Sequence, residues 1–242
     1  SFFIAYLIKR SNEAFGLFKR WLTVAAISGA FFFLTRYREA GHLALVTLFE
    51  ITFFYAWVIS IFYVVFIKRD ISLFIQSVTL SFICAILIWN AFMDRTTHTL
   101  NPLLDSFWLG IHVPAAILGY GAFLLSFVVS MYYVYAERKE RPLGRLASLN
   151  TGLIMGGVML LTACIITGAI WAKSAWGRFW SWDPKETWAL VTFVIYASGV
   201  AVREVFKLNP RCQAYFSILG FMAMLFTFFG VGLFLTSHHA YQ

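Results

Sequence analysis

Long apolar runs alternate with short charged or Pro/Gly-containing segments along almost the whole chain. Seven of these runs have roughly the length, about 20 residues, that a helix needs to cross the hydrocarbon core of a bilayer. The pattern therefore predicts an all-α polytopic membrane protein whose residues 1–242 form a single transmembrane domain. The expected helices cover approximately residues 21–35, 43–67, 71–93, 107–136, 148–172, 186–206 and 212–236.

Residues 1–8 are also apolar and lead into Lys9 and Arg10, as the cytoplasmic end of a further helix would. Eight residues are too few to span a bilayer. We therefore expect this stretch to belong to an eighth helix that begins before Ser1, or to lie in the membrane interface.

The composition agrees with a protein whose partner is the lipid bilayer. Apolar residues make up 61% of the chain and charged residues 12%, whereas soluble domains carry about 25% charge. The net charge of +8 would suggest nucleic acid in a soluble protein, but here the basic residues act as topology signals, and no nucleic-acid partner is expected. The three cysteines, Cys84, Cys164 and Cys212, form no CxxC motif and are expected to be packing residues.

The basic residues predict the orientation, because cytoplasmic loops are enriched in Lys and Arg. With the chain from residue 9 onward starting on the cytoplasmic side, thirteen of the nineteen basic residues lie inside and the C-terminus lies on the outer face. The thirteen are Lys9, Arg10, Lys19, Arg20, Lys68, Arg69, Arg138, Lys139, Arg141, Arg145, Arg203, Lys207 and Arg211. The outer ones are Arg36, Arg38, Arg95, Lys173, Arg178 and Lys185.

This orientation brings every histidine to or near the outer face. The five are His42, His98, His112, His238 and His239. Imidazole is a common ligand of haem iron, so the grouping favours one outer-face site. Histidine is also tolerated at a membrane interface, and the grouping alone is weak evidence for such a site.

The densest motif is the outer loop, residues 173–188, which contains WGRFWSWDPKETW from Trp176 onward. Asp183 followed by Pro184 predicts a helix start, with Asp183 at the N-cap and Glu186 reaching back as in a capping box. The loop tryptophans would suit an aromatic belt as well as a ligand platform. A belt, however, requires no fixed spacing and no Gly, Arg or Asp between the rings.

The loop resembles the tryptophan-rich WWD signature of the cytochrome c assembly proteins that handle haem, and its DPKETW ending is similar to the CcsA/ResC branch of the System II cytochrome c synthetase. The segment 102–113, with His112, resembles the stretch that leads into the next helix in the family. Gly41-His42, Leu48-Phe49-Glu50 and His239-Ala240-Tyr241 match further family stretches. The resemblance covers nearly the whole chain from about residue 17.

The resemblance implies a haem b whose iron has two axial histidine ligands, His112 and His239. His238 is a candidate substitute for His239, and His98 is expected to be only solvated. Arg178 or Lys185 could pair with the haem propionates. The cofactor-binding set implied in this way is His112, His239, Trp176, Gly177, Arg178, Trp180, Trp182 and Asp183; no catalytic side chain is implied.

The function implied by the family is presentation of haem at the outer face for covalent attachment to an apocytochrome c with a CxxCH motif. A CcsB/ResB-type membrane partner is implied as well, and the chain would be part of a holocytochrome c synthetase of the haem lyase type. The expected location is the bacterial cytoplasmic membrane or the thylakoid membrane, with the haem site facing the periplasm or lumen.

One departure from the family pattern keeps other functions open. The family has a further histidine in the helix after the tryptophan loop, and this chain has Ala201 there. That histidine is attributed to an inner haem site through which haem reaches the outer face. A haem-bearing subunit of a membrane electron-transfer complex is therefore the main alternative, and a transporter of a non-haem solute is the third.

Glu50 is the one acidic residue well inside a predicted span. A carboxylate in the membrane is energetically expensive and therefore a functional candidate. It follows His42 by only eight residues, so it lies near the outer end of its helix. Proton handling and a structural hydrogen-bonding role both remain open for it.

Overall fold

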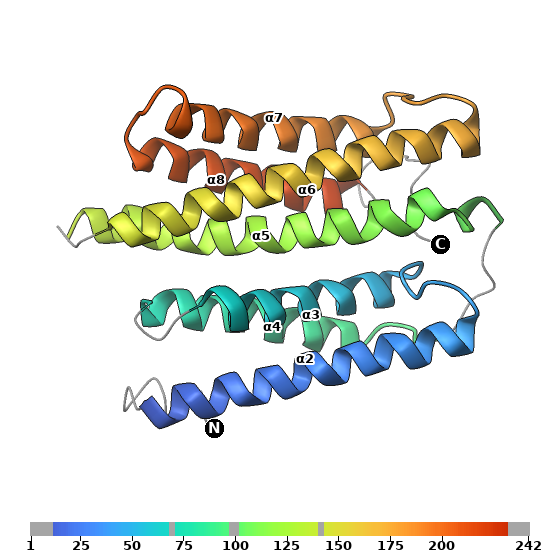
Figure 1. Ribbon diagram of the computed structural model, residues 1–242, viewed down its shortest axis with the longest axis horizontal. Coiled ribbons are helices and arrows are strands. Elements are labelled where there is room, and N and C mark those ends of the chain that lie inside the picture. Colours follow the sequence, from blue (N-terminus) through green and yellow to red (C-terminus); the bar gives the residue numbers. More distant parts are fainter. Residues whose placement is uncertain (1–11, 68–70, 97–101, 140–142, 232–242) are drawn as a thin grey trace. The chain divides into compact units, whose positions relative to one another are not determined.

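The computed structural model describes residues 12–67, 71–96, 102–139 and 143–231. Within these ranges it is helical and contains no strand (Figure 1). All seven expected helices are present, so the all-α prediction is confirmed. They are α2 (Asn12–Ala40), α3 (Leu48–Phe66), α4 (Leu73–Ala91), α5 (Phe107–Glu137), α6 (Gly144–Trp176), α7 (Pro184–Glu204) and α8 (Pro210–Leu225), with a short 3-10 turn, η1 (Pro102–Leu104), before α5 and a π-helix, η2 (Phe226–Gly230), after α8.

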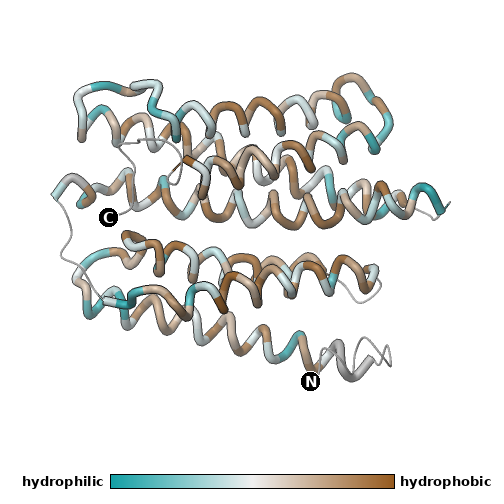
Figure 2. Tube along the Cα trace, turned by 180° about the vertical axis from the view of Figure 1, so that it is seen from behind, coloured by the Kyte–Doolittle hydropathy of each residue, from teal (hydrophilic) through white to brown (hydrophobic). Residues whose placement is uncertain are grey.

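Six of the described helices are long and apolar enough to cross a membrane: α2 from Gly16 onward, α3, α4, α5, α6, and α8 with η2. The remaining one, α7, has 21 residues but carries charged side chains at both ends, which lowers its mean hydropathy. Along the chain, hydrophobic residues follow the helices and hydrophilic residues gather mainly near their ends (Figure 2).

Several helix ends differ from the expected ones. The first helix was expected at 21–35 but covers Asn12–Ala40, because Lys19, Arg20, Arg36 and Arg38 lie within the helix instead of ending it. Long basic side chains can extend their charged ends to water while their stems stay against apolar surface. The last expected helix, 212–236, starts at Pro210 and is described as α8 to Leu225 and η2 to Gly230, while its expected end at residue 236 lies outside the described residues.

The chain divides into two compact units, and each is described by itself. Unit 1 is Ser1–Thr99 and contains α2, α3 and α4, with α3 packed against both other helices. Phenylalanines of α2 pack against phenylalanines of α3 in the contact between these two helices. Trp57 of α3 completes it: its indole nitrogen Nε1 donates a hydrogen bond of 2.6 Å to the backbone oxygen of Ala26, and the indole lies against Gly29.

Unit 2 is Leu100–Gln242 and contains α5 to α8 with η2. Helix α5 packs against α6 and α8, and α7 packs against the same two helices. At the centre, the rings of Phe123 and Tyr196 stack with centroids 3.6 Å apart. Gly157 and Gly220 flank this pair, since a Cβ atom at either position would collide with the adjacent ring. One layer of side chains therefore joins all four helices.

Candidate functional site

His112 lies in the second turn of α5 and is partly buried. Its ring nitrogen Nδ1 is 2.7 Å from the backbone oxygen of Cys164 in α6, and 3.4 Å from the Cys164 Sγ atom. A carbonyl oxygen can only accept, so Nδ1 carries the proton and the lone pair of the ring is on Nε2. Histidines that ligate metals commonly donate their other N–H to such a carbonyl, which fixes the tautomer and the ring orientation.

No pattern in the sequence indicated Cys164 as the partner of His112. The two residues are 52 positions apart, and the accepting atom belongs to the backbone, which is the same for every residue type. The His112 ring also lies against Gly168, one helical turn beyond Cys164. A glycine in the interior of a predicted helix was the only available hint.

The tryptophan loop begins with a glycine whose conformation ends α6. Gly177 has a φ of 78°, in the left-handed region that favours glycine. Its N–H donates to the Lys173 backbone oxygen at 3.0 Å, and the Lys173 Nζ atom donates to the Gly177 oxygen at 2.8 Å. Gly177 therefore holds the start of the loop through the backbone.

The loop ends at the expected helix start. Asp183 is the N-cap of α7, and its carboxylate accepts the Lys185 N–H at 2.9 Å, which confirms the predicted cap. The expected capping box is wrong in detail: Glu186 accepts from the N–H and hydroxyl of Ser181, at 2.8 Å and 3.2 Å, and so reaches past the N-cap. Trp182, between Ser181 and Asp183, has a φ of 58°, so the chain turns directly before the N-cap.

The loop tryptophans differ in their surroundings. Trp176 packs edge-on against buried Trp171, with centroids 4.7 Å apart. Trp180 and Trp182 are nearly perpendicular, at 86° and 5.9 Å. Trp182 is 69% exposed. Trp176 therefore belongs to the packing of α6, while Trp182 presents its ring at the surface.

The charged candidates of the loop also differ. Arg178 is exposed. Lys185, in the first turn of α7, is partly buried.

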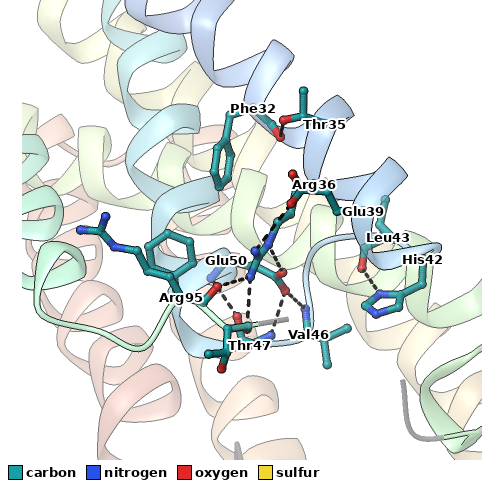
Figure 3. Close-up of polar contacts among 12 residues, drawn as sticks. Phe32, Thr35, Arg36, Glu39, His42, Leu43, Val46, Thr47, Glu50 and Arg95 are labelled. Atoms are coloured by element: carbon teal, nitrogen blue, oxygen red, sulfur yellow. Dashed lines mark hydrogen bonds and ion pairs between the residues drawn. The ribbon is translucent and has the colours of Figure 1, made fainter. Parts of the chain in front are cut away.

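Glu50 is almost fully buried and belongs to a capping and ion-pair network in unit 1 (Figure 3). Its Oε2 atom accepts the N–H groups of Val46 and Thr47, at 3.0 Å and 3.1 Å, and the Thr47 hydroxyl accepts the Glu50 N–H. Its Oε1 atom is 3.1 Å from Nε of Arg36. The Arg36 Nη2 atom donates to the Arg95 backbone oxygen at 2.7 Å. Of the two open roles, these contacts support the structural one, since they join α2, the start of α3 and the segment after α4.

Of the other four histidines, the structure describes one. His98, His238 and His239 lie outside the described residues, so the second axial ligand stays a prediction. His42 is described, and its Nδ1 atom is 3.1 Å from the neighbouring Leu43 oxygen. Ala201 lies in α7, as the sequence indicated.

Comparison with known proteins relates the chain to one family. The model of the family described as "Cytochrome C assembly protein" matches residues 45–239, a range that includes His112, His239 and the whole tryptophan loop. The cytochrome c biogenesis protein CcsA of Chlamydomonas reinhardtii is 31% identical over 225 residues, with 86% of this chain and 63% of that protein covered. Protein NrfI of Wolinella succinogenes is also 31% identical, over 220 residues, with 86% of this chain but 24% of that protein covered.

A third relative, the CcsA protein of Prochlorococcus marinus strain MIT 9301, is 29% identical over 249 residues and is covered to 79% of its length. The chain spans less than two thirds of the Chlamydomonas protein and about a quarter of NrfI. The family match, by contrast, extends over most of this chain and agrees with its apolar helices. The chain is therefore an integral membrane protein that belongs to the cytochrome c assembly protein family.

Proposed function

We propose that this protein acts in cytochrome c biogenesis by presenting haem b at the outer face of its membrane for covalent attachment to apocytochrome c. The observation that carries the proposal is the hydrogen bond from His112 Nδ1 to the Cys164 carbonyl. With the proton on Nδ1, the ring lone pair is on Nε2, and imidazole ligates iron through an unprotonated nitrogen of this kind. Membership of the cytochrome c assembly family supplies the biological context.

The residues of unit 2 fit a haem in their chemistry. His112 offers a ligand nitrogen with a carbonyl behind it, and His239 would supply the second ligand. Exposed Trp182 offers an aromatic face that can stack on a flat macrocycle. Lys185, in the first turn of α7, would pair with a propionate, because a charged amine and a carboxylate form a strong hydrogen bond.

Each residue would then have a defined task. His112 would ligate the iron and Trp182 would stack on the macrocycle, while the caps at Gly177 and Asp183 keep the loop between α6 and α7 in place. The haem supplies the iron that the histidines ligate and the vinyl groups to which the thiols of a CxxCH segment add. The protein's own contribution is position and ligation, which bring the reacting groups together.

We further propose the topology and partners that this task requires. The tryptophan loop faces the periplasm or the thylakoid lumen, in keeping with the excess of basic residues on the opposite side. A CcsB/ResB-type membrane protein acts with this chain as part of a holocytochrome c synthetase, and the apocytochrome with its CxxCH motif is the acceptor.

A second candidate function is supported by Ala201. Without a histidine at this position, the α7 side chain cannot ligate a haem on the way to the outer face. A protein that keeps its haem permanently, as a subunit of a membrane electron-transfer complex, has no need of such a residue. Both candidates share the His112 site and differ in whether the haem leaves.

Haem transfer separates the two candidates. The purified protein, loaded with haem and kept reduced, is mixed with an apocytochrome c and, in a control, with the same apocytochrome whose CxxCH cysteines are replaced by Ser. A haem donor should yield covalently attached haem with the first acceptor and none with the second. Retention of all haem by the membrane protein, also with a CcsB/ResB-type partner present, would contradict the biogenesis proposal and support the electron-transfer alternative.

A further inference from the structure

We infer that Gly168 is a positioning residue for His112, because only a residue without a side chain at this place lets the imidazole reach the Cys164 carbonyl. A Cβ atom at position 168 would lie 2.6 Å from Nδ1 and 2.7 Å from Cε1 of the His112 ring. Both distances are far below van der Waals contact. The consequence for haem rests on the proposed function, whereas the hydrogen bond itself does not.

The place of Gly168 relative to the Cys164 carbonyl explains its contact with the His112 ring. The carbonyl of residue i points along the helix toward the N–H of residue i+4. In this structure the His112 ring approaches the Cys164 oxygen over Gly168. The Thr167 hydroxyl already lies 3.2 Å from the same oxygen, although its shorter bond, 2.7 Å, goes to Ala163. A Cβ at 168 would block the direction that remains for the ring.

Comparison with three other glycines of α6 shows that the contact is local. Gly152 and Gly156 have no atom within 4 Å of a built Cβ, so alanine would fit at either position. Gly157 faces the Phe123 ring in the core of unit 2. Only Gly168 among these four lies against a ring that carries a candidate ligand nitrogen.

An alanine at position 168 should act through His112. The rigid imidazole would have to rotate away, which breaks the 2.7 Å bond and removes the preference for the Nδ1–H tautomer. Changes in the partner of a metal-ligating histidine typically weaken metal binding about 10-fold to 100-fold. We expect Gly168→Ala to weaken haemin binding by at least about tenfold.

The test uses the full chain with Gly168→Ala and, as matched control, Gly156→Ala in the same helix. The first readout is the ¹⁵N NMR spectrum of histidine-labelled, haem-free protein, with the His112 signal identified by its loss in His112→Ala. Wild type and Gly156→Ala should show the Nδ1–H tautomer, and Gly168→Ala should lose it. The second readout is the affinity for added haemin, which should fall only in Gly168→Ala.

A double variant keeps the test decisive if Gly168→Ala alone folds poorly. His112→Ala removes the ring and hence the clash, so His112→Ala/Gly168→Ala should fold like His112→Ala. Free imidazole should partly restore haemin binding to the single His112 variant. It should restore much less in the double variant, since the methyl group added at position 168 occupies the place where the imidazole would donate to the carbonyl.

The outcomes separate the inference from the function on which it rests. An unchanged tautomer and unchanged haemin affinity in Gly168→Ala would overturn the inference, as would an equal loss in Gly156→Ala or equal imidazole rescue in the two His112 variants. If the tautomer changes as expected but the wild-type protein binds no haemin, the positioning role of Gly168 stands and the haem proposal fails.

Discussion

Two aromatic rings in this protein rest on helical glycines in the same way, one in each unit. In unit 1, Trp57 of α3 lies against Gly29 and donates to the Ala26 carbonyl of α2. In unit 2, His112 lies against Gly168 and donates to a carbonyl of α6. In both cases the missing Cβ lets a ring N–H reach a backbone oxygen of the neighbouring helix.

The difference between the rings is the second nitrogen. Indole has one N–H, which is a donor only, so the contact of Trp57 can do no more than join two helices. Imidazole has a second nitrogen, which carries the lone pair once the proton is fixed on the first by the carbonyl. The same packing arrangement therefore stabilises unit 1 and, in the proposed function, orients a ligand in unit 2.

The largest expected effect comes from removing the His112 ring, and replacing the Trp57 indole is the matched comparison. His112→Ala should reduce the haem-to-protein ratio by about tenfold or more, and His112→Ala combined with His239→Ala should leave none, because an axial ligand is lost at each step. Trp57→Phe should leave the ratio of the folded protein unchanged and cost about 1 kcal/mol for the lost hydrogen bond. Absorption spectra and haem assays of purified protein measure the haem content, and thermal unfolding measures the stability. Wild-type haem content in the double histidine variant would show that iron is held by other residues.

The next largest effect concerns Glu50 and Glu39, the acidic partners of Arg36 in unit 1. It tests whether the ion pair between Arg36 and Glu50 stabilises the fold or has a role in haem binding. Glu50→Ala should destabilise the protein by about 3 kcal/mol, since it leaves Arg36, whose side chain is only 12% exposed, without its buried carboxylate and removes the side-chain half of the capping box of α3 that Glu50 supplies. Glu39→Ala is the control: its carboxylate is 66% exposed and 4.0 Å from Arg36, so the change should be below about 0.5 kcal/mol. Thermal unfolding in detergent compares them. A loss of haem in Glu50→Ala without a loss of stability would instead assign Glu50 a role in function.

Gly29→Ala should have an intermediate effect and sharpen the comparison with Gly168. The added methyl would overlap the Trp57 indole, and overpacking of this kind costs about 1–3 kcal/mol. Its effect should appear in the unfolding temperature, with haem affinity of the folded fraction unchanged. If Gly29→Ala lowered haem affinity as strongly as Gly168→Ala, the two glycines would not have separate tasks.

The smallest effect is expected in the tryptophan loop. Trp182→Ala should weaken haemin binding about threefold to tenfold, the amount that one aromatic contact supplies, with stability retained because the ring is exposed. Trp176→Ala should lower stability instead, because this ring packs on Trp171. Haemin titration and thermal unfolding of both variants test the distinction. Unchanged haemin affinity in Trp182→Ala would favour an aromatic belt over a haem platform.

Much of the fold could be predicted from the sequence because membrane helices depend on long apolar runs, which are local signals. The N-cap at Asp183 was predicted for the same reason: cap, proline and first turn are adjacent in the chain. The ends of α2 could not be predicted in this way, because basic side chains can lie within a helix where its ends reach water.

Of the candidate site, the motifs indicated His112 but not its surroundings. The hydrogen bond to Cys164 joins residues 52 positions apart through a backbone atom, and no side-chain pattern encodes it. The division of the tryptophans into packed Trp176 and exposed Trp182 also depends on tertiary contacts. Glu186 reaches Ser181 because the loop turns at Trp182, a conformation that residue types do not dictate.

The bond from His112 to a main-chain oxygen has a consequence for how the protein tolerates mutation. The Cys164 carbonyl is retained whatever side chain position 164 carries, so Cys164→Ala and Cys164→Ser should be accepted despite the direct contact with the histidine. Position 168, which has no side chain to form an interaction, should tolerate almost no substitutions. In a saturation library selected for haem binding, position 164, whose backbone supplies the acceptor oxygen, should therefore tolerate more substitutions than position 168, where any side chain would collide with the His112 ring.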